Sequence, residues 1–310
     1  MRIGLIGAGR WGTRYITTLA RMPGTELTHV GSHNPETRRL VPEACRVSGD
    51  WRAVLADQSL DGVILASPPM THAPLALEAI AAGLPVLIEK PMAMNVADAQ
   101  AVAEAANAAG VLVMVGHTHL FSPAYRALKQ RGNSLGRLHR TQSSAGNDGP
   151  VRLDTNVLWD WGPHDVAMCV DLFGDFPESV QALIVGQRRL AGGMGQALAL
   201  HLVFPEGGAD IKISNIEDQK LRLFEASYEY GRLIYDDIHA PKLSESLPGQ
   251  TAAPIPVDPV PPLTRVVQEF ADSIGSNVRT HPSLTLGVQV VQVLAQCEET
   301  LCPQGSLSNL

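Results

Sequence analysis

A short apolar run ends abruptly in charge at residues 86–91, which read Val-Leu-Ile-Glu-Lys-Pro. Burying a charge without a partner is costly, so a lysine at this place should be delivered to a ligand at the end of the strand. Pro91 fixes the backbone beside it, and a cis bond is one geometry that suits such a rigid turn. We predict that Lys90 is a positioned ammonium group. A surface lysine that merely follows a strand is the structural alternative.

A second charged cluster, Leu-Trp-Asp-Trp-Gly-Pro-His-Asp, occupies residues 158–165. Proline is tolerated in the first turn of a helix, so Pro163 predicts a helix that begins near residues 160–162 and has His164 in its first turn. Asp160 and His164 are four residues apart and can lie close together at that end. An N-cap aspartate and a packed, hydrogen-bonded histidine are the structural alternatives.

A glycine-rich loop, Gly7-Ala8-Gly9-Arg10-Trp11-Gly12, follows the apolar run 2–6 and precedes helical periodicity. In that setting the pattern is the dinucleotide fingerprint: Gly7 allows a tight turn, Gly9 admits a pyrophosphate and Gly12 lets helix and strand pack closely. The helix N-terminus offers free N–H groups to phosphates. A plain glycine turn is the alternative. The predicted cofactor contacts are Gly7, Gly9, Arg10, Trp11, Gly12, Ser32, His33, Arg38, Ser67, Pro68, His72, Glu89 and Lys90.

The ribose end of this predicted site lacks the usual acid. Ser32-His33-Asn34 stands where an Asp or Glu would bind the ribose 2′-hydroxyl of NAD, and Arg38 and Arg39 follow. An arginine can bind a 2′-phosphate, so the sequence leans slightly toward NADP and leaves NAD open. Both arginines could equally be solvated surface residues.

The elements that must position these groups fall into two kinds. Strands alternate with helices in the first third of the chain, which predicts βαβ units and a parallel sheet. After residue 120, strands joined by glycine turns predict antiparallel pairing, with a helix over 163–173 and a proline-rich loop over 248–262. We predict an α/β chain: a Rossmann doubly wound parallel sheet in residues 1–120, then an α+β substrate and oligomerisation domain with an open, mainly antiparallel sheet in residues 121–310. The strands expected after residue 120 cover 138–144, 179–185, 197–204, 209–214, 220–225 and 233–235.

Three blocks carry a family resemblance: GAGRWG, then SPPMTHAPLALEAIAAGLPVLIEKP, then DWGPH. Their order and spacing resemble the glucose–fructose oxidoreductase, inositol dehydrogenase and MocA family over essentially the whole chain. The resemblance implies an NAD(P)-dependent oxidoreductase acting on a CH–OH group of a sugar, sugar nucleotide or cyclitol, with Lys90, Asp160 and His164 as catalytic residues. Many members carry an acid where this chain has Ser32-His33, which leaves the choice of cofactor open.

The three catalytic candidates suit alcohol oxidation, which moves a hydride to a nicotinamide and a proton to a base. We expect His164 to be the base, because the positive end of its helix disfavours imidazolium, and Asp160 to orient it. Lys90 would stabilise negative charge on the reacting oxygen. An equivalent scheme lets Lys90 take the proton, and the sequence leaves both schemes open.

Other polar residues are weaker candidates for substrate contacts. Residues 152–159 are similar to relatives that act on nucleotide-activated sugars, and an arginine there could bind a phosphate or carboxylate. His117 and His119 have no third ligand at a suitable spacing, so we expect no metal. Each candidate could equally be a surface residue. The candidates are His117, Tyr125, Arg152 and Asn156.

Composition excludes several classes of partner. The 310 residues carry a net charge of −7, which argues against a nucleic-acid surface, and no apolar run has the length of a membrane span. The chain enters a strand directly after Met1-Arg2, so we expect no signal peptide, and its four cysteines lack paired spacing. Reduced thiols and a cytoplasmic location follow as expectations.

The alternating apolar residues of 198–204 predict strong burial in the second sheet. An open sheet with helices on one face has a second face to cover, so we expect a homo-oligomer, a dimer or tetramer, built through that sheet. Two other functions stay open. One is a catalytically silent, cofactor-binding sensor of the same fold, and the other is a reductase of a non-sugar substrate.

Overall fold

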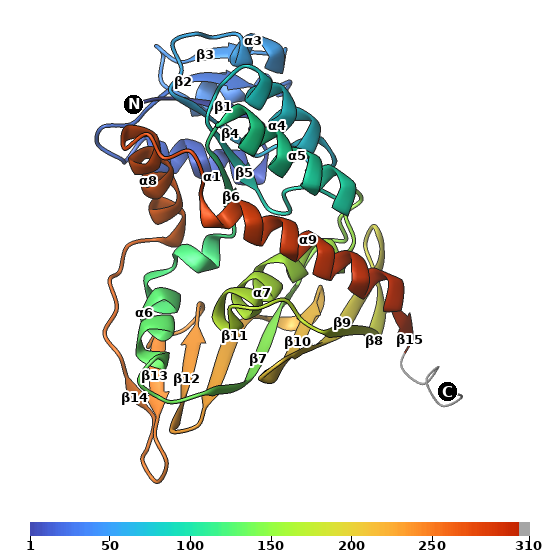
Figure 1. The fold of residues 1–310 in the computed structure, drawn as a ribbon. Helices are drawn as coiled ribbons and strands as arrows, with labels where there is room; N and C mark the ends of the chain where they lie inside the picture. Colours follow the sequence, from blue (N-terminus) through green and yellow to red (C-terminus); the bar gives the residue numbers. More distant parts are fainter. Residues whose placement is uncertain (304–310) are drawn as a thin grey trace. The chain divides into compact units, whose positions relative to one another are not determined.

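The computed structural model describes residues 1–303, which form two compact units (Figure 1). The first unit holds residues 1–118 and 261–291, and the second holds residues 119–260 and the chain from residue 292 on. Residues 261–291, assigned to the second domain from sequence, are thus grouped with the first unit. The domain boundary at residue 120 stays a prediction.

Six parallel strands form the sheet of the first unit, in the order β3-β2-β1-β4-β5-β6. This is the order of the doubly wound dinucleotide-binding sheet, so the predicted Rossmann sheet is confirmed. Every residue of β4, β5 and β6 is buried, which explains their continuous apolar sequences. The strands are β1 Arg2–Ile6, β2 Glu26–Gly31, β3 Arg46–Ser48, β4 Gly62–Leu65, β5 Val86–Glu89 and β6 Val113–Gly116.

The helices of the first unit begin and end at recognisable signals. The side chain of Asn95 accepts a hydrogen bond from the Asp98 amide at the start of α5, and Gly110 ends that helix in the left-handed conformation. Helix α8 packs against α1, and its Phe270 ring lies where a side chain on Gly62 would be. The helices are α1 Arg10–Leu19, α2 Thr37–Leu40, α3 Trp51–Leu55, α4 His72–Ala81, α5 Val96–Ala109 and α8 Pro262–Gly275, with the 3₁₀ turn η1 at Pro69–Thr71.

Nine strands form the sheet of the second unit, in the order β14-β13-β12-β11-β7-β10-β9-β8-β15. Neighbouring strands are antiparallel except for the β7–β10 and β8–β15 pairs, so the predicted open, mainly antiparallel sheet is confirmed. The strands are β7 Leu138–Asp148, β8 Ser179–Leu190, β9 Gly193–Phe204, β10 Gly207–Ser214, β11 Ile216–Tyr228, β12 Gly231–Asp236, β13 Leu243–Ser246, β14 Ala253–Pro254 and β15 Cys302–Pro303.

Helix α7 (Val157–Phe173) lies across one face of this sheet, against β7, β9 and β10 (Figure 1). Alternate residues of β9 are buried beneath it, namely Leu198, Leu200, Leu202 and Phe204. The Phe204 ring stacks on Phe173, with 4.2 Å between ring centroids. The predicted burial of this strand is therefore explained by α7. The other helices are α6 Pro123–Gly132 and α9 Pro282–Thr300, with the 3₁₀ turn η2 at Thr118–Phe121.

The predicted start of this helix near residues 160–162 is wrong. Helix α7 begins at Val157, because the side chain of Asn156 caps it by accepting a hydrogen bond from the Trp159 amide. Pro163 therefore lies inside the helix, beyond the first turn to which sequence reasoning confined it. His164 consequently lies in the second turn. The field of a helix end falls off within one turn, so it no longer gives a reason for a neutral His164.

The strands of the second sheet run longer than predicted, and the three short strands β13, β14 and β15 were not predicted. β13 and β14 are paired beside β12, and β14 lies inside the segment 248–262 that the sequence predicts as a proline-rich loop. Pro254 can sit there because β14 is the last strand of the sheet, where no second neighbour needs its missing N–H group. Among residues 1–303, no helix combines the length and the apolar character of a membrane span.

Candidate functional site

The glycine loop of the first unit forms a cradle in which three positions, Gly7, Gly9 and Gly12, carry no side chain. Gly7 has a φ of +98°, and a Cβ atom there would lie 2.6 Å from the backbone of Ala66. A Cβ atom on Gly12 would lie 2.0 Å from the Gly7 carbonyl oxygen, whereas one on Gly9 would meet no atom within 4 Å. The first turn of α1 has no acidic residue and no side-chain cap, so its N–H groups suit the phosphates of a dinucleotide.

Helix α2, which follows β2, carries two arginines with different contacts. The guanidinium group of Arg38 donates hydrogen bonds to the carbonyl oxygens of Val41, Pro42 and Cys45. Arg39 instead pairs with Glu36, and 79% of its side chain is exposed. Ser32 bonds the hydroxyl of Thr37 at 2.8 Å, and His33 is exposed. Arg38 thus ties α2 to the loop that follows it, whereas Arg39 and His33 are exposed.

His72, the first residue of α4, connects two loops at the carboxyl ends of the strands. Its Nε2 atom lies 2.9 Å from the carbonyl oxygen of Ser67, and its Nδ1 atom lies 2.7 Å from that of Pro91. Carbonyl oxygens only accept, so both hydrogen bonds form together only when the ring is doubly protonated. The ring is buried, and it ties the Ser67-Pro68 turn after β4 to the turn that follows Lys90.

Lys90 lies directly after β5 and is 8% exposed, and its bond to Pro91 is cis. The neighbouring Glu89 is buried, accepting hydrogen bonds from the Tyr15 hydroxyl at 2.7 Å and from the Lys90 amide at 3.1 Å. Burial raises the pKa of Glu89, while Tyr15 and Lys90 act to lower it. Burial and Glu89 together raise the pKa of Tyr15. These contacts fix the backbone from which Lys90 projects.

His117 follows β6 and is 1% exposed. Within residues 1–303, neither of its ring nitrogens has a hydrogen-bond partner. Burial lowers the pKa of His117 to about 3, and the charge of Lys90 contributes in the same direction. The His117 ring is therefore neutral at pH 7, and within residues 1–303 its two nitrogens make no hydrogen bond. It lies close enough to Lys90 for the charge of Lys90 to affect its pKa.

Asp160 lies in the first turn of α7, in the second unit, and is held by Arg152. The Arg152 Nη1 atom donates to Asp160 at 2.8 Å, while its Nε and Nη2 atoms donate to the two oxygens of Asp154 at 2.9 and 2.6 Å. Hydrogen bonds from Arg152 lower the pKa of Asp154. One guanidinium group therefore serves two carboxylates, so a substrate anion would have to compete for it.

His164, one turn further along α7, is 5% exposed. Its ring meets that of His119 edge to face, with 4.9 Å between centroids and 88° between ring planes. The next residue, Asp165, is fully buried and accepts a hydrogen bond from Arg222 at 3.4 Å. Burial raises the pKa of Asp165, and Arg222 partly offsets this. Sequence reasoning did not assign a role to Asp165 or Arg222.

The remaining substrate candidates have contacts inside the second unit. The Tyr125 hydroxyl donates to the Met168 carbonyl oxygen at 2.9 Å and contacts Asp171 at 2.8 Å, which joins α6 to α7. Asn156 caps α7 and also donates to Glu298 at 3.1 Å. In residues 1–303, no group of three or more His, Cys, Asp or Glu side chains could hold a metal ion.

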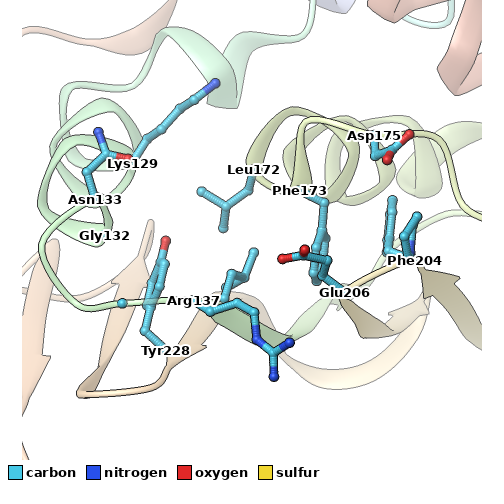
Figure 2. A pocket seen from close by; sticks show the side chains of 13 residues that line it. Lys129, Gly132, Asn133, Arg137, Leu172, Phe173, Asp175, Phe204, Glu206 and Tyr228 are labelled. Carbon is cyan, nitrogen blue, oxygen red and sulfur yellow. The ribbon is translucent and has the colours of Figure 1, made fainter.

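A cavity of about 430 Å³ opens at the other end of α7, between that helix, α6 and the sheet (Figure 2). None of the predicted site residues lines it. Phe173, on its wall, is nine residues beyond His164, or about 13 Å along the helix at about 1.5 Å per residue. The cavity is thus separate from Asp160 and His164, the candidate catalytic residues on the same helix. The residues that line it include Lys129, Asn133, Arg137, Leu172, Phe173, Glu206 and Tyr228 (Figure 2).

Comparison with known proteins identifies the family. The family model for the glucose–fructose oxidoreductase, inositol dehydrogenase and MocA group, described as an oxidoreductase family with an NAD-binding Rossmann fold, matches residues 1–117. A protein of known structure from Magnetospirillum magnetotacticum MS-1, provisionally named an oxidoreductase, is 41% identical with a TM-score of 0.90, and the match covers 96% of this chain and 99% of that one. The chain belongs to this oxidoreductase family.

Relatives of this family member with named activities align over part of their length. Inositol 2-dehydrogenase 4 from Saccharopolyspora erythraea is 39% identical over 144 residues, which cover 44% of this chain and 43% of that protein. The 4-carboxy-2-hydroxymuconate-6-semialdehyde dehydrogenase of Sphingobium sp. is 32% identical over 187 residues, covering 56% of this chain and 58% of that protein. The chain thus spans about half the length of these curated relatives. Its first unit is an NAD(P)-binding Rossmann fold, and the family resemblance seen in the motifs is confirmed.

Proposed function

We propose that the protein is an NAD(P)-dependent oxidoreductase that transfers a hydride between the nicotinamide and a secondary alcohol of a sugar, sugar nucleotide or cyclitol. The observation that carries the proposal is Lys90 at the carboxyl end of β5, in the sheet whose first strand leads into the glycine cradle. Ligands of open α/β sheets bind at that end of the strands. Membership of an oxidoreductase family supports the same reaction class.

We assign the chemistry to three residues. A bound nicotinamide supplies the hydride acceptor or donor. Lys90, as an ammonium group, hydrogen-bonds the reacting oxygen and stabilises the negative charge that develops on it. His164 accepts the alcohol proton, and Asp160 stabilises the imidazolium that results. The scheme in which Lys90 takes the proton uses the same residues with the two roles exchanged.

For the cofactor we propose that NADP binds at least as well as NAD. The support is chemical: Ser32, His33 and Asn34 include no acid that would repel a 2′-phosphate. The sequence predicts Arg38 as a cofactor contact, but its guanidinium group donates to three carbonyl oxygens of the loop after α2. Arg39 is therefore the better candidate to bind the 2′-phosphate. Fluorescence titration with both cofactors tests this, and a clear preference for NAD contradicts it.

For the substrate, the inositol 2-dehydrogenase relative favours a cyclitol or sugar. The semialdehyde dehydrogenase of Sphingobium sp. favours the second candidate, a non-sugar carbonyl compound. Of the weaker substrate contacts, we propose His117 first, because its buried ring has hydrogen-bonding capacity that no described residue uses. Arg152 is the proposed contact for an anionic group, while Tyr125 and Asn156 have the contacts within the second unit described above.

We further propose that the protein works in the cytoplasm as a homo-oligomer, a dimer or tetramer. Cys45, Cys169 and Cys297 are buried and free, which suits a reducing compartment.

The deciding experiment is a turnover assay with NAD and NADP against inositols, aldoses and sugar nucleotides, with a semialdehyde for comparison. We expect Lys90→Ala and His164→Ala to lower kcat by roughly 10²–10⁴, the usual worth of a positioned acid–base group, with cofactor Kd nearly unchanged. Exposed Lys220→Ala and His239→Ala are the matched controls. Tight cofactor binding with no turnover of any substrate would favour the silent sensor. Near wild-type rates in both site variants would refute the catalytic assignment.

A further inference from the structure

A chain of three polar side chains within the second unit ends at His119. His119 lies in η2 and is 8% exposed, and its Nδ1 atom is 2.9 Å from the hydroxyl oxygen of Tyr235 on β12. Tyr235 is 1% exposed, and the same oxygen is 3.1 Å from a carboxylate oxygen of Asp237. The family motifs account for none of these three residues, which lie outside every block that carries the resemblance.

The proton positions along this chain follow from what each group can do. A carboxylate only accepts, so the single hydroxyl hydrogen of Tyr235 is donated to Asp237. The phenolic oxygen then accepts from His119, which requires the hydrogen on Nδ1. Burial and the charge of Asp237 raise the pKa of Tyr235 and outweigh a hydrogen bond with the Ser122 side chain that acts to lower it, so the hydroxyl proton stays in place at neutral pH. In a neutral His119 ring, Nε2 therefore keeps its lone pair.

His119 in turn contacts the proposed base. Its ring meets the ring of His164 at 4.9 Å between centroids and 88° between planes, so the edge of one imidazole faces the plane of the other. The two rings come from different elements, η2 and α7, and each is buried. A ring held by Tyr235 and Asp237 can therefore fix the rotation of the His164 ring about its side-chain bonds.

We propose that His119 is a positioning residue for His164, held as the Nδ1–H tautomer by Tyr235 and Asp237. The proposal deepens the proposed function, on which its catalytic consequence rests. The hydrogen-bonded chain itself does not depend on that function, so the two can fail separately.

The first test is spectroscopic and needs no substrate. In protein labelled with ¹⁵N-histidine, ring nitrogen shifts distinguish the two tautomers and the doubly protonated ring, and His119→Gln identifies the His119 signals. We expect a protonated Nδ1 and an unprotonated Nε2 at pH 7.5, and a shift toward the other tautomer in Tyr235→Phe. Tyr230→Phe, at a residue 57% exposed, is the control. An Nε2–H or doubly protonated ring in the wild-type protein would overturn the proposal.

The second test asks whether His119 acts on His164. In His119→Ala the His164 ring signals should shift and broaden, because an edge-to-face neighbour is lost. With a substrate identified, kcat should fall roughly 10–100-fold, the usual effect of losing a side chain that orients a functional histidine, while KM and cofactor Kd change little. Tyr235→Phe should give part of this loss. Unchanged His164 signals and unchanged kcat in a folded His119→Ala protein would mean a merely structural contact. Absence of turnover by the wild-type protein would count against the proposed function and leave the tautomer result standing.

Discussion

Around Lys90, burial is the largest cause of the shifted pKa values of Tyr15, Glu89 and His117. Glu89 is buried against Tyr15, and burial raises the pKa values of both groups. His117 is buried without a hydrogen-bond partner among the described residues, and its pKa falls to about 3. Lys90 therefore follows a buried carboxyl group whose pKa burial raises, and its charge adds to the effect of burial on the pKa of His117.

The depressed pKa of His117 predicts a specific acid sensitivity. As pH falls from about 6.5 toward 3, the unfolded chain binds a proton that the folded ring does not, so stability decreases in that window and is fully present above it. We expect His117→Asn to flatten the dependence of unfolding free energy on pH by up to about 1.4 kcal/mol per pH unit. Urea unfolding at pH 7.5, 6 and 5 measures it. Exposed His239→Asn is the control, and equal slopes in wild type and His117→Asn would contradict the prediction.

The sequence allowed the candidate site residues to be selected, but not the side chains that contact them. Local motifs were enough to select Lys90 and His164 as candidates, because each motif is read within a few residues. The partners that hold such groups lie far away in the chain: Tyr15 is 74 residues from Glu89, and His119 is 116 residues from Tyr235. No periodicity links such pairs, so a single sequence carries no signal for them.

The position at which helix α7 begins determines which of its polar residues lies in the first turn. Reading Pro163 as a first-turn residue moved the predicted start several positions too late, whereas the capping side chain of Asn156 sets the true start. Asp160, rather than His164, consequently occupies the first turn. A capping residue such as Asn156, four residues before Asp160, is a usable sequence signal for the start of a helix. Here it indicates an earlier start than the rule that places proline in the first turn.

We expect Asn156→Ala to lower the unfolding free energy by about 1 kcal/mol, and Asn156→Ser to recover most of that loss. The physical reason is the Trp159 amide, which loses its acceptor in the alanine variant. Chemical unfolding of both variants measures the effect. If Asn156 is chiefly a substrate contact, the alanine variant will instead raise KM and leave stability unchanged.

The short helix α2 separates two arginines by role. Arg38→Ala removes the donor to three loop carbonyl oxygens, so we expect lower stability with an unchanged ratio of NADP to NAD affinity. Arg39→Ala should leave stability intact and weaken NADP relative to NAD by up to about fivefold, as for an exposed ion pair worth about 0.2–1 kcal/mol. Cofactor titrations and melting temperatures of both variants decide. A loss of NADP preference in Arg38→Ala alone would reverse the assignment.

For the molecule as a whole, the two sheet types and the motifs that lead to the site were predictable, because they follow from hydrophobic periodicity and turn residues. The full length of the strands and the presence of β13, β14 and β15 were not predictable, since strand ends and short edge strands depend on pairing with neighbours. On the open face of the second sheet, polar pairs such as His201–Asp210 and Arg140–Asp210 lie among exposed apolar side chains, including Val203 and Leu223. Such a mixed face is compatible with an interface between copies.

We expect the wild-type protein to be a dimer or tetramer and the double variant Val203→Glu, Leu223→Glu to be smaller. Both side chains lie on the face that α7 does not cover, at 48% and 40% exposure, and an added carboxylate would be desolvated in an interface. Light scattering at micromolar concentration measures the mass. Leu153→Glu, at a residue 92% exposed, is the control. A monomeric wild-type protein would be the contrary result.

The buried Tyr15–Glu89 pair has a consequence for how this chain can change by mutation. A Cβ atom on Gly116 would lie 3.3 Å from the Tyr15 hydroxyl and 3.5 Å from a Glu89 oxygen, so three distant positions share one small volume. Replacing Tyr15 by Phe removes a hydrogen-bond donor from the buried Glu89 carboxyl group. A larger residue at position 116 would press against both Tyr15 and Glu89. Homologues that fold, and variants selected from a mutant library, should therefore change positions 15, 89 and 116 together or not at all. The backbone that carries Lys90 should be conserved along with these three positions.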